Sequence, residues 1–230
     1  MSDWPSIFHA AVTGFGFALL FSSIPVGPIN LTILNEGARR GFKWALLIGL
    51  GASVMEVIYC SIAFTGLSSF FDSRVVKASM EVFTFVFLLF LGSKFLTAQT
   101  LNLPTKLGAA SEKLEARLGE KLHPHSAFMT GFVRVMCNPG VLLTWIVLAA
   151  NFMAHDWVDN TLATKIACVS GVALGTNAWF CILSFGVSRG HGQFSERTLL
   201  RFQHISGICL IVVALFDGGH IVWQLARHKI

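Results

Sequence analysis

Six long apolar segments constrain this chain more than any other feature of its sequence. Each is long enough for the ~20 residues that a helix needs to cross a bilayer. The segments are Ile7–Leu34, Trp44–Leu67, Met80–Ala98, Ala127–Ala154, Leu162–Val187 and Leu199–Leu225. Only 13% of the residues are charged, whereas a soluble domain has about a quarter. The sequence therefore predicts an all-α membrane protein with six transmembrane helices in one domain over residues 1–230.

The basic residues predict how these helices are oriented. Eleven lie in the loops after the first, third and fifth segments, and five lie on the other side of the membrane. Because cytoplasmic loops carry an excess of Lys and Arg, the first group of loops should be cytoplasmic and both termini periplasmic. The positive charge is spread over short loops and not gathered on one face. It therefore indicates membrane topology and not a nucleic-acid partner.

The first apolar segment contains residues that break helices. Pro25, Gly27, Pro28 and Asn30 fall within six positions of one another. A proline removes a backbone donor and clashes with the preceding turn, so a first helix should break near Pro25 and restart around Pro28. Non-helical backbone at membrane depth survives where it is buried in protein or lines a wet cavity. The break is either a simple kink or part of a binding site.

The fourth segment repeats this pattern. Thr13–Phe15 precedes the first break, and Thr130–Phe132 precedes Asn138 and Pro139. Each half holds three predicted helices, an odd number, so the second half should insert upside down relative to the first. Inverted repeats with matching broken helices indicate a transporter site near the membrane midplane. We expect repeats over about 1–98 and 127–230, joined by a cytoplasmic linker, 99–126.

Polar residues within the apolar segments are candidates for that site. An ungapped alignment of the second and fifth segments places Glu56 opposite Asn177. Burying a carboxylate at the bilayer centre costs about 2.5–3.5 kcal/mol, so Glu56 should find a partner or be protonated. Arg134 is a natural partner for Glu56, or for Asp217. A structural ion pair is one interpretation. Alternatively, Glu56 binds a substrate ammonium or a coupling proton, and Arg134 holds a carboxylate.

Catalytic and metal-binding patterns are absent from the sequence. It contains no G-x-S-x-G, H-E-x-x-H or P-loop motif, and we predict neither an enzyme nor a cofactor. The cysteines lie in apolar segments without C-x-x-C spacing: Cys60, Cys137, Cys168, Cys181 and Cys209. They are interpreted as small apolar residues of helices and not as a metal site.

These residues together resemble a known family. The run P-V-G-P-I-N, the following R-R-G-F and the later G-F-V-R-V-M-C-N-P-G are similar to motifs of the lysine exporter (LysE/RhtB) family of amino-acid exporters. The resemblance covers nearly the whole chain. It implies six helices and export of an amino acid or similar small solute. By the same resemblance, Pro28, Asn30, Glu56, Asn138 and Pro139 carry the site.

The resulting hypothesis is a secondary transporter of the bacterial inner membrane that works by alternating access. Its partners would be a small-molecule substrate and the lipid bilayer, with a homodimer left open. The predicted substrate site comprises Pro25, Gly27, Pro28, Asn30, Glu56, Arg134, Asn138, Pro139 and Asn177. Two alternatives remain at this point. One is an exporter of a metal or another inorganic ion. The other is a membrane scaffold that docks a partner through an amphipathic helix at Lys106–Leu122.

Overall fold

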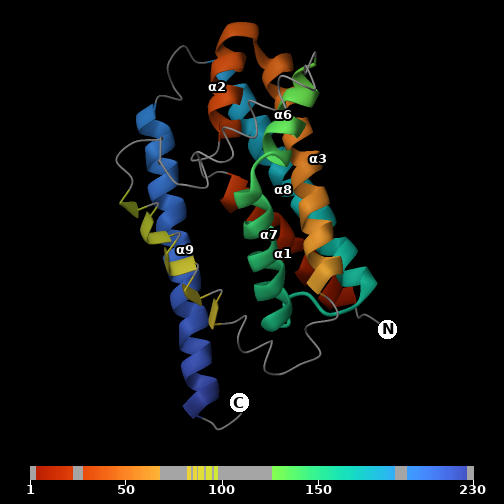
Figure 1. Ribbon diagram of the computed structural model, residues 1–230, viewed down its shortest axis with the longest axis vertical. Helices are drawn as coiled ribbons and strands as arrows, with labels where there is room; N and C mark the ends of the chain where they lie inside the picture. Colours follow the sequence, from red (N-terminus) through yellow and green to blue (C-terminus); the bar gives the residue numbers. More distant parts are fainter. Residues whose placement is uncertain are drawn as a thin grey trace.

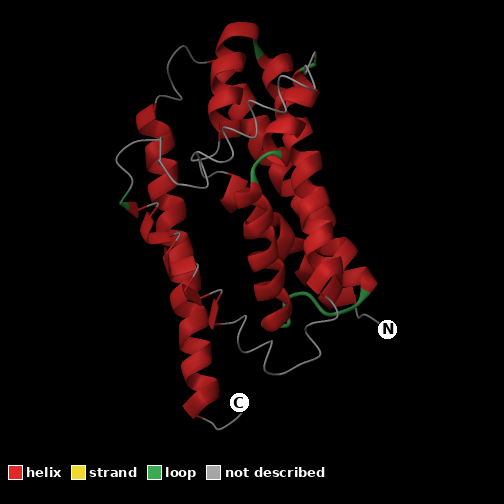
Figure 2. Ribbon diagram, viewed as in Figure 1, coloured by secondary structure: helices red, strands yellow, loops and turns green. Residues whose placement is uncertain are grey.

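The computed structural model describes residues 4–22, 28–67, 126–189 and 196–226, together with 82–83, 85–86, 88–90, 92–94 and 96–97. Every regular element in these ranges is a helix (Figure 2). The bounds are α1 (Trp4–Ser22), α2 (Pro28–Arg40), α3 (Phe42–Leu67), α6 (Ala127–Met136), α7 (Pro139–Ala154), α8 (Leu162–Arg189) and α9 (Glu196–Ala226).

The described helices have the length and composition of membrane spans. Three of them, α1, α3 and α8, are each long and apolar enough to cross a bilayer, and the bent pair α6 and α7 meets the same criterion together. This bears out the expected all-helical membrane protein. The segment Met80–Ala98 and the linker lie largely outside the described residues, so the count of six spans stays a prediction.

The two helix breaks fall where prolines predict them. The helix α2 begins at Pro28, and α7 begins at Pro139, with an angle of 67° between α6 and α7. Proline suits the first position of a helix because the amide hydrogen it lacks has no helical partner there. Pro25 and Gly27 lie outside the described residues.

Two crossings with close backbone contact organise the helices. The helix α1 packs mainly against α8, and α6 packs mainly against α3, while α3 and α8 also cross each other. A Cβ on Gly14 would clash with the carbonyl oxygen of Cys168, and a Cβ on Gly131 would clash with that of Ile48. Glycine therefore lets each pair of backbones touch.

Each crossing contains a second contact of the same kind. Gly171 faces the carbonyl oxygen of Ala11, and Gly51 faces that of Phe128. Gly51 and Gly171 are 120 positions apart. Ile48 and Cys168, whose carbonyl oxygens face Gly131 and Gly14, are separated by the same number of positions. These contacts favour an alignment in which Glu56 matches Thr176, one residue away from the Asn177 expected above.

The helix α9 lies to one side of the other labelled helices (Figure 1). It packs against the partly described residues between 82 and 97, where Leu88 joins Leu210 and Ala214 in a small apolar cluster. Gly92 lies beside Gly207 and Ile211 of α9. Leu20 and Phe21 of α1 pack against the same cluster and connect it to the other helices.

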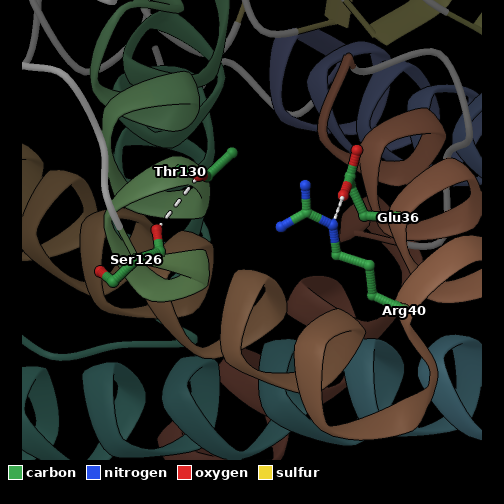
Figure 3. Close-up of polar contacts among 4 residues, drawn as sticks. All are labelled: Glu36, Arg40, Ser126 and Thr130. Carbon is green, nitrogen blue, oxygen red and sulfur yellow. Dashed lines mark hydrogen bonds and ion pairs between the residues drawn. The ribbon is translucent and has the colours of Figure 1, made fainter.

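Charged residues mark one end of the molecule. The two termini lie at the same end in Figure 1, and the junction of α2 with α3 lies at the opposite end. Near that junction Arg40 pairs with Glu36 at 2.9 Å (Figure 3) and stacks over Trp44 at 4.6 Å. The helix α6 begins nearby, where the Ser126 backbone oxygen accepts a hydrogen bond from Thr130 Oγ1 at 3.1 Å.

The glycine contacts can be tested by substitution. Gly14→Ala should lower the thermal unfolding midpoint in detergent, because the added methyl group forces α1 away from α8 at a cost of about 1–3 kcal/mol. Gly16→Ala in the same helix is the matched control, since a Cβ there meets nothing within 4 Å. Equal midpoints for the two variants would show that close packing at Gly14 is unimportant.

Candidate functional site

A buried polar cluster lies at the first break. Ser22, the last residue of α1, donates a hydrogen bond from Oγ to Glu56 Oε2 of α3 at 3.3 Å. The Asn30 side chain in α2 donates from Nδ2 to the Ser22 backbone oxygen at 3.0 Å. All three residues are buried, and Asn30 is only 1% exposed. Asn30 thus supplies a hydrogen-bond donor to the backbone carbonyl of the last residue of α1.

The fifth apolar segment reaches the same cluster. Trp179 of α8 donates from Nε1 to Asn30 Oδ1 at 3.3 Å. The indole is buried, as is the pair formed one turn earlier by Thr176 Oγ1 and Ser53 Oγ at 2.6 Å. Hydrogen bonds therefore connect α3, α1, α2 and α8 in one continuous series around the break.

The second break is held by different groups. The Asn138 side chain accepts a hydrogen bond from the Gly140 amide at 3.0 Å and so caps α7. The Tyr59 hydroxyl of α3 donates to the backbone oxygen of Met136, the last residue of α6, at 2.7 Å. An asparagine side chain thus makes a hydrogen bond at each break. A side chain from another helix also bonds each break, Trp179 of α8 the first and Tyr59 of α3 the second.

The ion pair between Glu56 and Arg134, one of the two interpretations of Glu56 given above, is not formed. Glu56 accepts its hydrogen bond from Ser22, whereas Arg134 Nη1 donates to Thr32 Oγ1 of α2. The cost of burying a charge predicted correctly that Glu56 faces the protein interior, but it could not predict which neighbour Glu56 would meet. The side chain of Asp217, the other partner considered, lies outside the described residues.

Asn177 does not join either group of hydrogen bonds. Its Nδ2 donates to the Ala173 oxygen of its own helix at 2.7 Å. Its buried Oδ1 has no hydrogen-bond partner in the described part of the chain. The glycine contacts instead match Glu56 with Thr176, the residue before Asn177.

Sequence reasoning missed Ser22, Thr32 and Trp179. Ser22 and Thr32 flank the first break, and a hydroxyl near a broken turn is a signal that could have identified them. Trp179 carried no such signal, because a tryptophan in an apolar helix is equally suited to face lipid.

Aromatic side chains gather around the end of α7. Phe17 of α1 meets Phe152 of α7 edge-on, with ring centroids 4.9 Å apart, and Trp157 lies 5.7 Å from Phe17. The His9 ring lies 3.3 Å from the Trp157 backbone oxygen. This aromatic cluster connects α1 to α7, as Arg134 and Thr32 connect α6 to α2.

The arrangement places a buried carboxyl and a guanidinium near two interrupted helices. Such a site can bind a solute with both a cationic and an anionic group, because helix N-termini and Arg134 attract anions and Glu56 attracts cations. Among the described residues, no three His, Cys, Asp or Glu side chains gather as a metal site would require.

Comparisons with known proteins agree with a transport role. Residues 7–216 match the model of the LysE type translocator family. The chain is 25% identical over 203 residues to the "Putative amino acid efflux protein YcgF" of Bacillus subtilis (strain 168), covering 88% of this chain and 92% of the relative. No solved structure matches the chain.

The role of Asn30 can be tested against a second asparagine. Asn30→Ala should destabilise the protein, because it removes hydrogen bonds from two buried groups at about 1–3 kcal/mol each. Asn177→Ala should cost less than about 1 kcal/mol, since the hydrogen bond of its side chain lies within α8 and alanine favours helix. Denaturant unfolding in detergent micelles measures both. A smaller loss for Asn30→Ala than for Asn177→Ala would contradict the bonding described.

Proposed function

Since the chain belongs to the LysE type translocator family, we propose that it is a secondary transporter which exports an amino acid or a similar small solute. The observation that carries this proposal is the buried Glu56 at the broken first helix, within a membrane transport protein. The name of the Bacillus subtilis relative, an amino acid efflux protein, supports export.

In the proposed architecture, two inverted three-helix repeats occupy about 1–98 and 127–230. Three observations support it: breaks at Pro28 and Pro139, the recurring glycine contacts, and the pairing of each half's first helix with the other half's middle helix. Broken helices at equivalent places of inverted repeats are where transporters of this design bind substrate.

The proposed substrate site lies between the two breaks. Pro28 begins the helix after the first break, and Asn138 and Pro139 begin the helix after the second; Pro25 and Gly27, which lie outside the described residues, stay part of the predicted site. The N-termini of α2 and α7 at the breaks and the Arg134 guanidinium would hold a carboxylate. Glu56 would bind the substrate ammonium or carry a coupling proton, with Ser22 and Asn30 fixing its surroundings. We leave Asn177 out of the site because its amide bonds the backbone of α8.

Alternating access requires contacts between the repeats to open in turn. Phe17 in α1 and Arg134 in α6 are 117 positions apart, as are Gly14 and Gly131. Each contacts the helix that follows the break in the other half, since Phe17 meets Phe152 and Arg134 meets Thr32. We propose that the two contacts act as opposite gates, one apolar and one polar.

Export can be tested by comparing the medium of cells with and without this protein. Cells supplied with a dipeptide mixture accumulate amino acids inside. We expect one or a few amino acids to rise in the medium only when the protein is present. An unchanged amino-acid profile with a changed inorganic-ion profile would favour the ion exporter instead.

The part played by Glu56 is tested by Glu56→Gln, which keeps the side-chain shape and removes the ionisable group. Export should fall to the background level while the amount of folded protein in the membrane is unchanged. Glu36→Gln is the control, because Glu36 is part of a partly exposed pair with Arg40 outside the cluster. Normal export by Glu56→Gln would remove Glu56 from the mechanism.

We further propose that the bilayer is the bacterial inner membrane and that both termini are periplasmic. An alkaline phosphatase joined after residue 226 should be active, because this enzyme needs the oxidising periplasm for its disulfides. The same enzyme inserted near residue 110 should be inactive. The reverse pattern would show the opposite orientation.

A further inference from the structure

Two buried aromatic donors occupy the same position in the two halves. Tyr59 of α3 and Trp179 of α8 are 120 positions apart, the separation that also relates Gly51 to Gly171. Tyr59 is 8% exposed and Trp179 is 4% exposed. Each has a ring that fills space in the helix bundle and one polar hydrogen at its edge.

Each donor reaches the break of the other half. Tyr59 belongs to the first half and bonds the Met136 oxygen, which ends α6 in the second half, at 2.7 Å. Trp179 belongs to the second half and bonds Asn30 of the first half at 3.3 Å. Asn30 in turn holds the Ser22 oxygen, which ends α1. The pattern is reciprocal, although Tyr59 bonds the terminal carbonyl directly and Trp179 bonds Asn30, which in turn bonds the terminal carbonyl.

The need for these donors follows from the surroundings. A broken helix leaves carbonyl groups without helical partners, and an apolar membrane interior has no water to replace them. A phenylalanine would keep most of either ring but would lose its donor. The polar hydrogens of Tyr59 and Trp179 therefore have a specific task that packing alone does not explain.

We propose that Tyr59 and Trp179 are equivalent positioning residues, each of which fixes the broken helix of the other half. This rests on the proposed two-repeat arrangement, but its test below requires no transported substrate. Loss of either donor should loosen the break that it holds and leave the other break in place.

Cys137 is a natural probe for the second break, because it directly follows Met136 and is buried at 1% exposure. The protein is made with the other cysteines replaced by alanine: Cys60, Cys168, Cys181 and Cys209. Alkylation of Cys137 by N-ethylmaleimide is then followed by mass spectrometry on purified, folded protein. Tyr59→Phe should speed alkylation about threefold to tenfold, the range for losing one hydrogen bond, and Trp179→Phe should change it less than about twofold.

The first break is probed in a second background, in which Cys137 is also replaced by alanine and Ser22→Cys supplies the thiol. Here the expected effects are exchanged, so Trp179→Phe speeds alkylation and Tyr59→Phe does not. Ser61→Ala is the control in both backgrounds, because it removes a hydrogen bond from Ser61 Oγ to the Val57 oxygen within α3. It should leave both thiols as slow as before.

Only this crossed pattern supports the proposal. If a phenylalanine variant speeds both thiols alike, speeds the wrong thiol or changes neither, the proposal is overturned. Each phenylalanine variant is compared across the two backgrounds, so the proposal stays testable with one variant when the other does not fold. A crossed pattern in a protein that exports no amino acid would support the positioning role and refute only the proposed function.

Discussion

Interrupted helices inside an apolar layer need hydrogen-bond donors, and the rest of the structure depends on how that need is met. The ends of α1 and α6 present the oxygens of Ser22 and Met136, which accept from Asn30 and Tyr59. Trp179 holds Asn30 in turn. The same interruption that must be stabilised also exposes helix ends that attract charged groups. The proposed site and its support are thus parts of one arrangement, and Glu56 supplies the carboxyl group that the proposed binding of a substrate ammonium requires.

Close backbone contact gives this arrangement its rigidity. Because α1 touches α8 and α6 touches α3 at glycines, the tightest units each combine one helix from either half. The halves are therefore interlocked, and relative motion is easier where side chains, not backbones, meet. Phe17 with Phe152 and Arg134 with Thr32 are contacts of that kind. This distribution of rigid and adjustable contacts suits a transporter that opens at one end at a time.

The sequence predicted the backbone features better than the side-chain partners. Proline chemistry located the starts of α2 and α7 at Pro28 and Pro139, and the cost of a buried charge placed Glu56 in the interior. Helical spacing defines a face but not the neighbour on it, so the sequence left open whether Glu56 pairs with Arg134. Apolar helices align ambiguously, which explains the one-residue difference at Asn177. An indole N–H gives no signal of its purpose, and Trp179 was missed for that reason.

The interlocked crossings also bear on how the chain is made. During synthesis α1 enters the membrane long before α8, yet its closest neighbours lie on α8. Until residues 162–189 are inserted, the backbone around Gly14 has no α8 packed against it and faces lipid. Asn30, which bonds the last residue of α1, then also lacks its hydrogen bond from the Trp179 indole. The first three segments therefore cannot complete their packing until α8, in the last third of the chain, has been inserted. Truncated or stalled chains would expose these surfaces to membrane quality-control proteases.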